Sequence, residues 1–386
     1  MSFKNLFSRA LAADPERLHM AAHSHHLWPD ASREGQIECW EDAARLADRK
    51  WDKVMGEVWP AAQAEVAAEL GSGRPDAVVF AGNTHDFLIR IAAACPRQPW
   101  RPLRVLTTDG EFHSARRQFA RWMETGEISQ KIIPAEPFDT LAERFLATAR
   151  NQKFDLILVS QLLFGSGRLL DDLAPLAELA SPEGPWVLVD GYHSFMALDT
   201  PLPAPLADRM FFVAGGYKYA MSGEGMGLLH APPGHGARPP ITGWYAEFED
   251  LTLAPGRIGY APDAMRFMGA TFDPSPLYRF LAVRRMLAAE GLSTAAISSH
   301  VARLHAQLLE AIAGTPLADA ELLNPLAEGP HARFLAFRSP QAAGWQQALR
   351  ERECVTDVRG DVLRVGLGLY HDQTDVDRFA ELAKTL

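Results

Sequence analysis

The stretch FFVAGGYKYAMSGEGMGLLH, residues 211–230, decides the fold class and raises the first functional question. It joins an apolar run to a glycine-rich segment, with Lys218 between two tyrosines. Most lysines at a strand end are surface charges, because burying an ammonium group is costly. The alternative is a buried amine whose neighbours lower its pKa, so that it can form a Schiff base. The rest of the chain decides between these two interpretations.

Apolar runs of this kind recur through the first two thirds of the chain. The further runs are AVVFAG (77–82), LRVLTTDG (103–110), FDLILVSQLLF (154–164), PWVLVDGYHS (185–194) and GMGLLHA (225–231). Helical patterns such as THDFLIRIAAAC and SARRQFARWME separate several of them. Near-continuous apolar strands that alternate with helices predict an α/β fold, with a mostly parallel sheet in αβα layers. Residues 31–70 are predicted to be helical as well.

The predicted strands end in segments that are polar or rich in glycine. These segments are GNTHD, DGEFHS, SQLLFGSG, DGYHS and GGYKYAMSGEG. In parallel sheets the ligand lies beyond the carboxyl ends of the strands. Most of the residues capable of chemistry are therefore expected at one edge of the sheet.

Three of these strand ends contain candidate binding residues. Asn83 and Thr84 begin a helix, where free backbone N–H groups favour a phosphate; a simple helix cap is the alternative. Asp190 ends an apolar strand and needs a cationic partner, such as a protonated pyridine nitrogen, unless it only caps a turn. Phe112 or His113 can stack on an aromatic ring, although this motif by itself favours Phe112 as a core residue.

Lys218 follows Asp190 by about the length of one strand-to-strand crossover, so the two residues are expected on neighbouring strand ends. Together these features supply a phosphate site, a carboxylate for a pyridinium, a stacking aromatic ring and a Schiff-base lysine. Pyridoxal 5'-phosphate requires this combination. The combination favours the buried-amine interpretation of Lys218.

With these motifs the chain resembles the fold-type-I pyridoxal-phosphate enzymes of the aminotransferase class V group, and is most similar to kynureninase and its relatives. The resemblance rests on DGYHS, GGYKYAMSGEGMGLLH, GWYAEF and DVLRVGLGLYHDQTDVDRF. It implies a large cofactor-binding domain over residues 21–274. A smaller domain would combine residues 1–20 with an α+β part over residues 275–386.

The resemblance also implies roles for individual residues. The cofactor contacts would be Asn83, Thr84, Phe112, Asp190, His193, Tyr217, Lys218, Trp244 and Thr271. The catalytic residues among them would be Lys218, Asp190, His193 and Tyr217, with Lys218 as the Schiff-base lysine. Arg364 would grip the substrate carboxylate, with Ser24 and His25 nearby. In a homodimer with shared active sites, Trp244 and Thr271 would reach the partner's cofactor.

The reaction implied first is kynureninase-like hydrolysis of a Cβ–Cγ bond in a kynurenine-type amino acid. Transamination or a lyase reaction on another small amino acid is the alternative, and a non-catalytic binding protein on the same scaffold is a third. The segments GWYAEFED, RFMGATFDPSP and AAHSHH depart from the kynureninase pattern where the substrate side chain is recognised. A cysteine desulfurase is disfavoured, because Cys354 enters an apolar strand directly after a helix and is expected to be packed.

Composition narrows the partners and the compartment. The chain has 386 residues and a net charge of −10, with no run of lysines or arginines. Nucleic acid and anionic membranes are therefore not expected partners. The three cysteines are widely spaced, which suggests neither a disulfide framework nor a zinc site. The start of the chain lacks a signal-peptide pattern, so a cytoplasmic enzyme is expected.

Overall fold

A computed structural model describes residues 2–98, 100–247, 252–254, 256–327 and 329–386. Its centre is a seven-stranded sheet in the order β2-β8-β7-β6-β5-β3-β4. The strands are β2 (Val78–Ala81), β3 (Leu103–Thr108), β4 (Ile128–Ile133), β5 (Leu156–Ser160), β6 (Trp186–Asp190), β7 (Phe211–Gly215) and β8 (Gly227–His230). β3, β4, β5, β6 and β7 run parallel, while β8 is antiparallel to both of its neighbours. The predicted mostly parallel sheet is confirmed.

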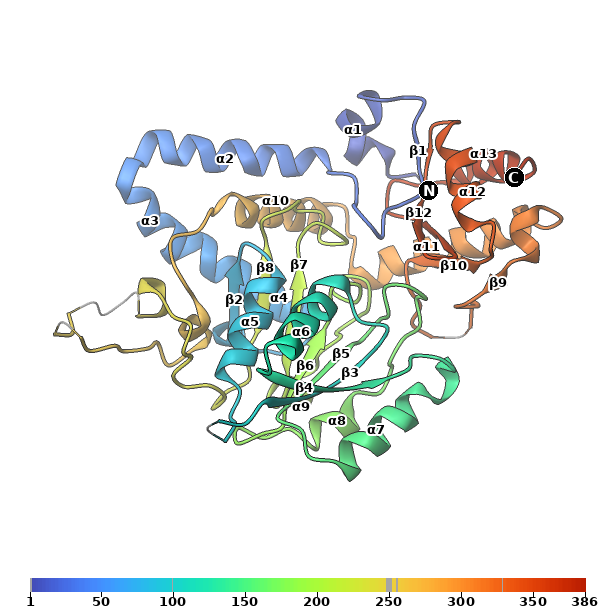
Figure 1. Cartoon of the computed structure of the whole chain (residues 1–386). Coiled ribbons are helices and arrows are strands. Elements are labelled where there is room, and N and C mark those ends of the chain that lie inside the picture. The colour runs from blue at the N-terminus through green and yellow to red at the C-terminus, as the bar shows by residue number, and fades with distance from the viewer. Residues whose placement is uncertain (1, 99, 248–251, 255, 328) are drawn as a thin grey trace.

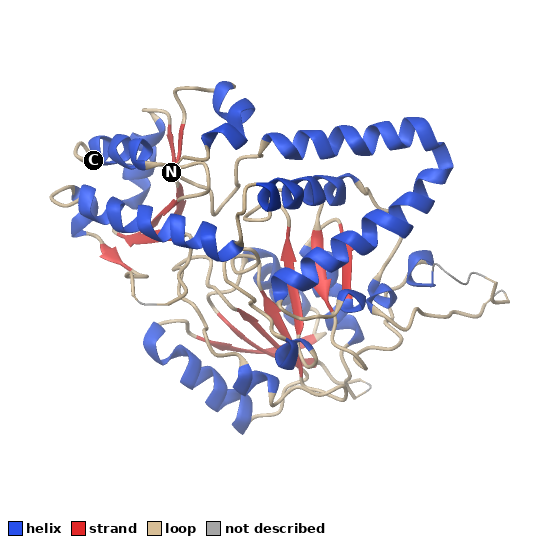
Figure 2. Ribbon diagram, turned by 180° about the vertical axis from the view of Figure 1, so that it is seen from behind, coloured by secondary structure: helices blue, strands red, loops and turns tan. Residues whose placement is uncertain are grey.

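The apolar runs become central strands because helices cover both faces of the sheet. Every residue of β5 and β7 is buried. Helices α5 (Thr84–Ala94) and α6 (His113–Glu124) lie on the face seen in Figure 1. Helix α4 (Trp59–Leu70) crosses the opposite face, seen in Figure 2. The predicted αβα layers follow from this arrangement.

Two elements in the first half of the chain differ from the sequence prediction. Strand β4 was not predicted, because it lies at the sheet edge and only the two end residues of its sequence ISQKII are buried. The predicted helix over 31–70 divides into α2 (Asp30–Leu46), α3 (Lys50–Lys53) and α4. Ala47 has a φ of 49°, in the left-handed region, and this conformation ends α2.

The C-terminal part forms its own antiparallel sheet in the order β12-β13-β10-β9. Its strands are β9 (Glu321–Leu322), β10 (Phe334–Arg338), β12 (Asp357–Arg359) and β13 (Val362–Gly366). The helices that accompany it are α11 (Thr294–Ala311), α12 (Ala342–Arg350) and α13 (Gln373–Ala383). Most of the buried apolar residues of this part form a core cluster separate from that of the large sheet. The α/β fold with a smaller α+β part is confirmed.

The N-terminal segment joins the C-terminal part. After the short helix α1 (Ser8–Ala12), strand β1 (Leu18–His19) pairs with β11 (Cys354–Val355). Figure 1 shows both chain ends in this region. The remaining helices are α7 (Leu141–Asn151), α8 (Ala174–Ala177), α9 (Ala204–Ala207) and α10 (Ser275–Ala289). No helix in the described ranges is both long and apolar enough to span a membrane.

The division of the chain at residue 274 remains a prediction. Helix α10 follows that boundary, yet it packs along α2 above the large sheet (Figure 1). Its buried residues Leu277, Phe280 and Val283 belong to the same core cluster as the sheet. α10 therefore connects the two parts of the chain.

Candidate active site

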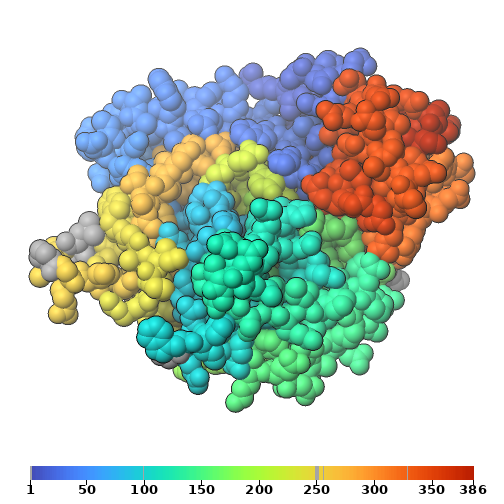
Figure 3. Space-filling model, viewed as in Figure 1, coloured from blue at the N-terminus to red at the C-terminus, as the bar shows by residue number. Residues whose placement is uncertain are grey.

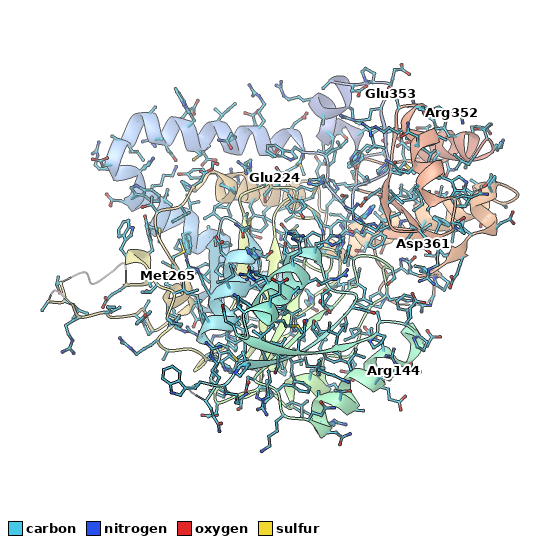
Figure 4. The ribbon with its side chains drawn as sticks, viewed as in Figure 1. Arg144, Glu224, Met265, Arg352, Glu353 and Asp361 are labelled. Atoms are coloured by element: carbon cyan, nitrogen blue, oxygen red, sulfur yellow. The ribbon has the colours of Figure 1, made fainter. Side chains whose placement is uncertain are left out.

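A cavity of about 820 Å³ lies beyond the carboxyl ends of the strands. Seven of the nine residues predicted to contact the cofactor line it: Asn83, Thr84, Phe112, Asp190, His193, Tyr217 and Lys218. Glu224, another lining residue, is labelled in Figure 4 beside α10. Figure 3 shows the orange and red C-terminal part packed against the green part of the sheet region. Fold topology therefore brings these distant residues to one place.

Lys218 lies in the turn that follows β7, and the turn depends on glycine. A Cβ atom added at Gly215 would lie 2.0 Å from the Tyr192 hydroxyl, and one at Gly216 would lie 2.1 Å from Ser222 Oγ. The lysine is only 5 % exposed. Burial lowers the pKa of its amine to about 7. A substantial fraction of Lys218 is therefore the neutral, nucleophilic amine at neutral pH.

His193 holds the amine of Lys218. Its Nε2 lies 2.7 Å from Lys218 Nζ. Burial lowers the pKa of His193 well below its ordinary value, and the charge of Lys218 lowers it further. A neutral ring that accepts from Nζ carries its own proton on Nδ1. Nδ1 is buried and has no hydrogen-bond partner among the described residues.

Asp190 ends β6, next to the strand that leads to Lys218. It stands opposite Val213 of β7, and the Tyr192 N–H donates to its Oδ1 over 2.9 Å. Burial raises the pKa of this carboxyl group, and the charge of Lys218 acts in the opposite direction. Asp190 forms no ion pair within the described part of the chain. It is thus a carboxylate available to a cationic group of a ligand.

The N-terminus of α5 forms one end of the cavity. The Asn83 side chain accepts a hydrogen bond from the Asp86 N–H over 3.0 Å, so it does cap the helix. Thr84 begins the helix and lines the cavity. A Cβ atom at Gly227 of β8 would lie 2.4 Å from the Asn83 backbone, so glycine is needed there. Backbone N–H groups at this end favour an anion such as a phosphate.

Aromatic side chains form much of the remaining wall. The Phe112 ring centroid is 5.8 Å from Lys218 Nζ, and Phe112 meets Phe164 edge to face at 5.3 Å. His25 does not line the cavity itself, but it stacks on Tyr217 with the centroids 5.0 Å apart. Ser24 adjoins it, with its Oγ 3.5 Å from His25 Nδ1. Two of the three predicted substrate residues, Ser24 and His25, are thus linked to the cavity through Tyr217.

Arg364 lies on β13, just behind the cavity wall. It is 2 % exposed and donates from Nη1 to the carbonyl oxygen of Phe164, a lining residue. Its Nη2 is paired with Asp357 of β12. Its Nε is buried and has no hydrogen-bond partner in the described ranges. The arginine therefore retains a free donor.

Trp244 and Thr271 do not line the cavity of this chain. Trp244 begins the short helix η6 (Trp244–Glu247) and is 45 % exposed. Thr271 is exposed in the loop before α10. Their role in a partner's site remains a prediction.

Sequence reasoning missed two acidic residues near the site. Glu111 is buried and accepts from Thr108 Oγ1 over 2.6 Å and from Ser160 Oγ over 2.5 Å. Burial raises the pKa of Glu111 to about 7. The signal was its place in DGEFHS, one of the polar strand ends. Asp357, the partner of Arg364, was missed because β12 was not predicted.

The cysteines lie away from the cavity. Cys354 is fully buried in β11, where burial raises the pKa of its thiol to about 12. Burial likewise raises the pKa of Cys95, and it raises that of Cys39 to about 11. None of the three lines the cavity. Each thiol is therefore held protonated at neutral pH and lacks the character of a nucleophile.

Two solved structures share the whole fold. A cysteine desulfurase from Thermococcus onnurineus superimposes with a TM-score of 0.79 at 18 % identity, covering 100 % of this chain and 99 % of that one. A cystine C–S lyase with glycine covalently linked to its PLP cofactor gives 0.78 at 18 % identity, covering 99 % of each chain. At this identity the likeness establishes the fold alone.

The family and its relatives are found by sequence. A probable cysteine desulfurase of Pseudomonas aeruginosa is 26 % identical, covering 83 % of this chain and 80 % of that one. An isopenicillin N epimerase of Streptomyces clavuligerus is 24 % identical, covering 89 % of each. These relatives give no support to the predicted resemblance to kynureninase. The aminotransferase class-V family matches residues 49–379. The chain therefore belongs to the aminotransferase class-V family, as a pyridoxal 5'-phosphate-dependent enzyme that acts on an amino acid.

Proposed function

We propose that Lys218 carries the cofactor, and that the enzyme removes the α-proton of an amino acid with an uncharged side chain. The observation that supports this most is the buried amine of Lys218, held 2.7 Å from a neutral histidine in a large cavity. Asp190 lies at the adjacent strand end and has no ion-pair partner in the described part of the chain. These residues fit the cofactor's aldehyde and ring nitrogen.

Other groups of the cavity fit the rest of the cofactor. The N-terminus of α5, with Thr84, would hold the phosphate, and Phe112 would face the ring. When bound, the cofactor draws electrons away from the α-carbon of the substrate. Nζ of Lys218 would take the α-proton, since a pKa near 7 suits a general base at neutral pH. His193 would keep Nζ in place.

The substrate would be held at two points. Arg364 would bind the α-carboxylate, with Ser24 and His25 beside Tyr217. The wall formed by Phe112 and Phe164 suits an apolar or aromatic side chain. We therefore retain hydrolytic Cβ–Cγ cleavage of a kynurenine-type amino acid as the first reaction to test, with Tyr217 or His193 positioning water or the substrate carbonyl.

Epimerisation at the α-carbon is the second candidate reaction. It is favoured by the relatives named isopenicillin N epimerase, which are 24 % and 26 % identical to this chain. Epimerisation needs proton removal and return on opposite faces of the α-carbon. Desulfuration through a cysteine is disfavoured, although one relative is named a probable cysteine desulfurase, because all three thiols lie outside the cavity.

The test begins with the cofactor. The wild-type protein loaded with pyridoxal 5'-phosphate should show a visible absorption band, and borohydride should fix the cofactor to Lys218, located by mass spectrometry. Lys218→Ala should lose the band and at least about 10⁴-fold in activity. Lys153→Ala, at an exposed position, should change neither. A band that persists in Lys218→Ala would contradict the assignment, and absence of any band would favour a binding protein.

Assays with different substrates then distinguish the candidate reactions by their products. Anthranilate and alanine released from L-kynurenine would support the hydrolase, whereas exchange of the α-proton for solvent deuterium with loss of chirality would support the epimerase. Sulfide from L-cysteine would support a desulfurase. Formation of an oxo acid with loss of the cofactor's absorption band would support transamination.

We propose, in addition, a homodimer in which Trp244 and Thr271 face the partner's cavity. Exposed aromatic side chains at Trp28, Trp40 and Trp244 suit a subunit interface. Lys218→Ala mixed and refolded with Thr271→Ala should regain activity, because half of the sites in hybrid dimers escape both changes. A monomer by sedimentation would contradict this proposal.

A further inference from the structure

A cluster of charges lies behind the cavity wall on the small sheet. Asp357 of β12 and Arg364 of β13 are direct cross-strand partners, and Arg364 Nη2 binds Asp357 Oδ2. The other carboxylate oxygen, Oδ1, lies 2.6 Å from Arg359 Nη1. The turn that joins the two strands is marked by Asp361 in Figure 4. One carboxylate therefore bridges two guanidinium groups.

The cluster keeps one net positive charge. His23 approaches Asp357 Oδ2 to 3.7 Å, but burial lowers the pKa of His23 to about 3, so the ring is neutral at neutral pH. Arg359 and Arg364 contribute two positive charges and Asp357 one negative charge. The remaining charge suits one further carboxylate.

The same cluster has unused donors. Nε of Arg359 and Nε of Arg364 are both buried without a hydrogen-bond partner in the described ranges. Buried donors of this kind are costly unless a ligand or water satisfies them. Arg364 adjoins the cavity through Phe164, whose carbonyl oxygen it binds. The free donor of Arg364 therefore lies next to the cavity, and that of Arg359 belongs to the same cluster.

We propose that Asp357 is a specificity-determining residue, which fills one of two carboxylate positions on the Arg359–Arg364 pair and leaves one for the substrate. Amino acids with a single carboxylate are then accepted, and those with a second carboxylate on a short side chain are rejected by the charge of Asp357. The inference rests on the proposed binding of the α-carboxylate at Arg364. It adds a reason why the side chain must be uncharged.

The repulsion between Asp357 and a second substrate carboxylate is large enough to discriminate between substrates with one and two carboxylates. Two negative charges about 5 Å apart repel by roughly 3 kcal/mol at the effective dielectric constant of a protein surface, which corresponds to about a hundredfold in affinity. Screening and side-chain motion reduce this effect, so about tenfold is the change to look for. Asp357→Asn keeps the shape of the side chain and removes its charge.

The experiment measures binding of propionate and succinate to the cofactor-loaded protein by calorimetry. Both probes lack an amine, so their binding does not depend on chemistry at Lys218. Wild type should bind propionate at least as tightly as succinate. Asp357→Asn should improve succinate binding by about tenfold more than propionate binding. Asp357→Asn combined with Arg359→Gln should lose that gain.

Three results would overturn the proposal: wild type that prefers succinate, Asp357→Asn with an unchanged ratio, or a double variant that keeps the gain. Loss of binding of both probes by a folded Asp357→Asn protein would instead mean that Asp357 only orients Arg364.

Arg359→Gln alone provides a test that does not depend on the folding of Asp357→Asn. It should weaken propionate binding by about tenfold, because the cluster then has no net charge. Unchanged binding there would also contradict the proposal. If borohydride fixes the cofactor to a residue other than Lys218, the proposed cofactor attachment is overturned, whereas the binding results for propionate and succinate still stand.

Discussion

Charged groups are arranged differently on two sides of the cavity. We call the strand ends with Asp190 and Lys218 the floor, and the part of the small sheet with Asp357, Arg359 and Arg364 the wall. On the floor, Asp190 and Lys218 lie at neighbouring strand ends, and burial shifts the pKa of each toward the neutral form. On the wall, Asp357 and Arg364 are paired with each other, and the adjacent Arg359 lowers the pKa of Asp357 further. The floor therefore keeps reactive groups available for a cofactor. The wall holds its charges in a prepared arrangement that a substrate carboxylate can join.

Removing the carboxylate of Asp190 on the floor is expected to have the largest effect. Asp190→Asn should lower kcat by about 10²–10³-fold, because the cofactor's protonated ring nitrogen would lose the buried carboxylate proposed as its partner, and loss of one partner of such a pair costs roughly 3–5 kcal/mol. It should also lower the pKa of Lys218 below about 7, since the charge of Asp190 raises that pKa. The measurement is the pH profile of activity and of the cofactor's absorption band. Asp171→Asn, on the surface, is the matched control.

An unchanged pH profile in Asp190→Asn, together with lost activity, would mean that Asp190 does not interact with Lys218. Full activity would remove Asp190 from the site altogether. Either result would contradict the view that the floor keeps reactive groups available for a cofactor.

The wall arginine should show a different kinetic pattern. Arg364→Gln should raise KM by about 10²-fold with a smaller change in kcat, because a charge-assisted contact to the carboxylate is lost. Arg364→Lys keeps the charge but not the planar fork, so KM should recover only in part. The measurement is steady-state kinetics with the substrate that the assays under Proposed function identify. Arg352→Gln, at an exposed arginine labelled in Figure 4, controls for a general loss of positive charge. A fall in kcat at constant KM would contradict carboxylate binding.

The floor was largely predictable from sequence, and the wall was not. Lys218, Asp190 and Thr84 follow apolar strands, and parallel topology brings strand ends together whatever the packing details. The pairing of Asp357 with Arg364 depends on the register of two short antiparallel strands, and β12 has too few residues to give a periodic signal. Burial of Glu111 and the neutral state of His193 arise only from tertiary packing.

Acid should lower the stability of the folded protein through three histidines near the wall. His23 and His26 are buried and His19 is half-buried, and desolvation lowers the pKa of each to about 3, against about 6.5 in an unfolded chain. Between these values the unfolded chain binds more protons, so stability is full above pH 6.5 and falls as the pH decreases toward 3. Each histidine contributes up to about 1.4 kcal/mol per pH unit. Thermal melting of the cofactor-free protein from pH 7.5 to 4.5 measures the slope, and a flat profile below pH 6.5 would contradict it.

The smallest expected effect concerns Cys354, on β11 beside the wall. Cys354→Ala should leave activity within about twofold, because burial holds this thiol protonated and away from the cavity. It should cost about 1–2 kcal/mol of stability, through loss of a small packed side chain. The measurement pairs denaturant unfolding with assays on L-cysteine and on the proposed substrate. Loss of sulfide release in a stable Cys354→Ala protein would show that β1 and β11 separate to expose the thiol. The wall would then be a moving part of a desulfurase, whereas unchanged turnover would mean that its packing is fixed and that the floor alone does the chemistry.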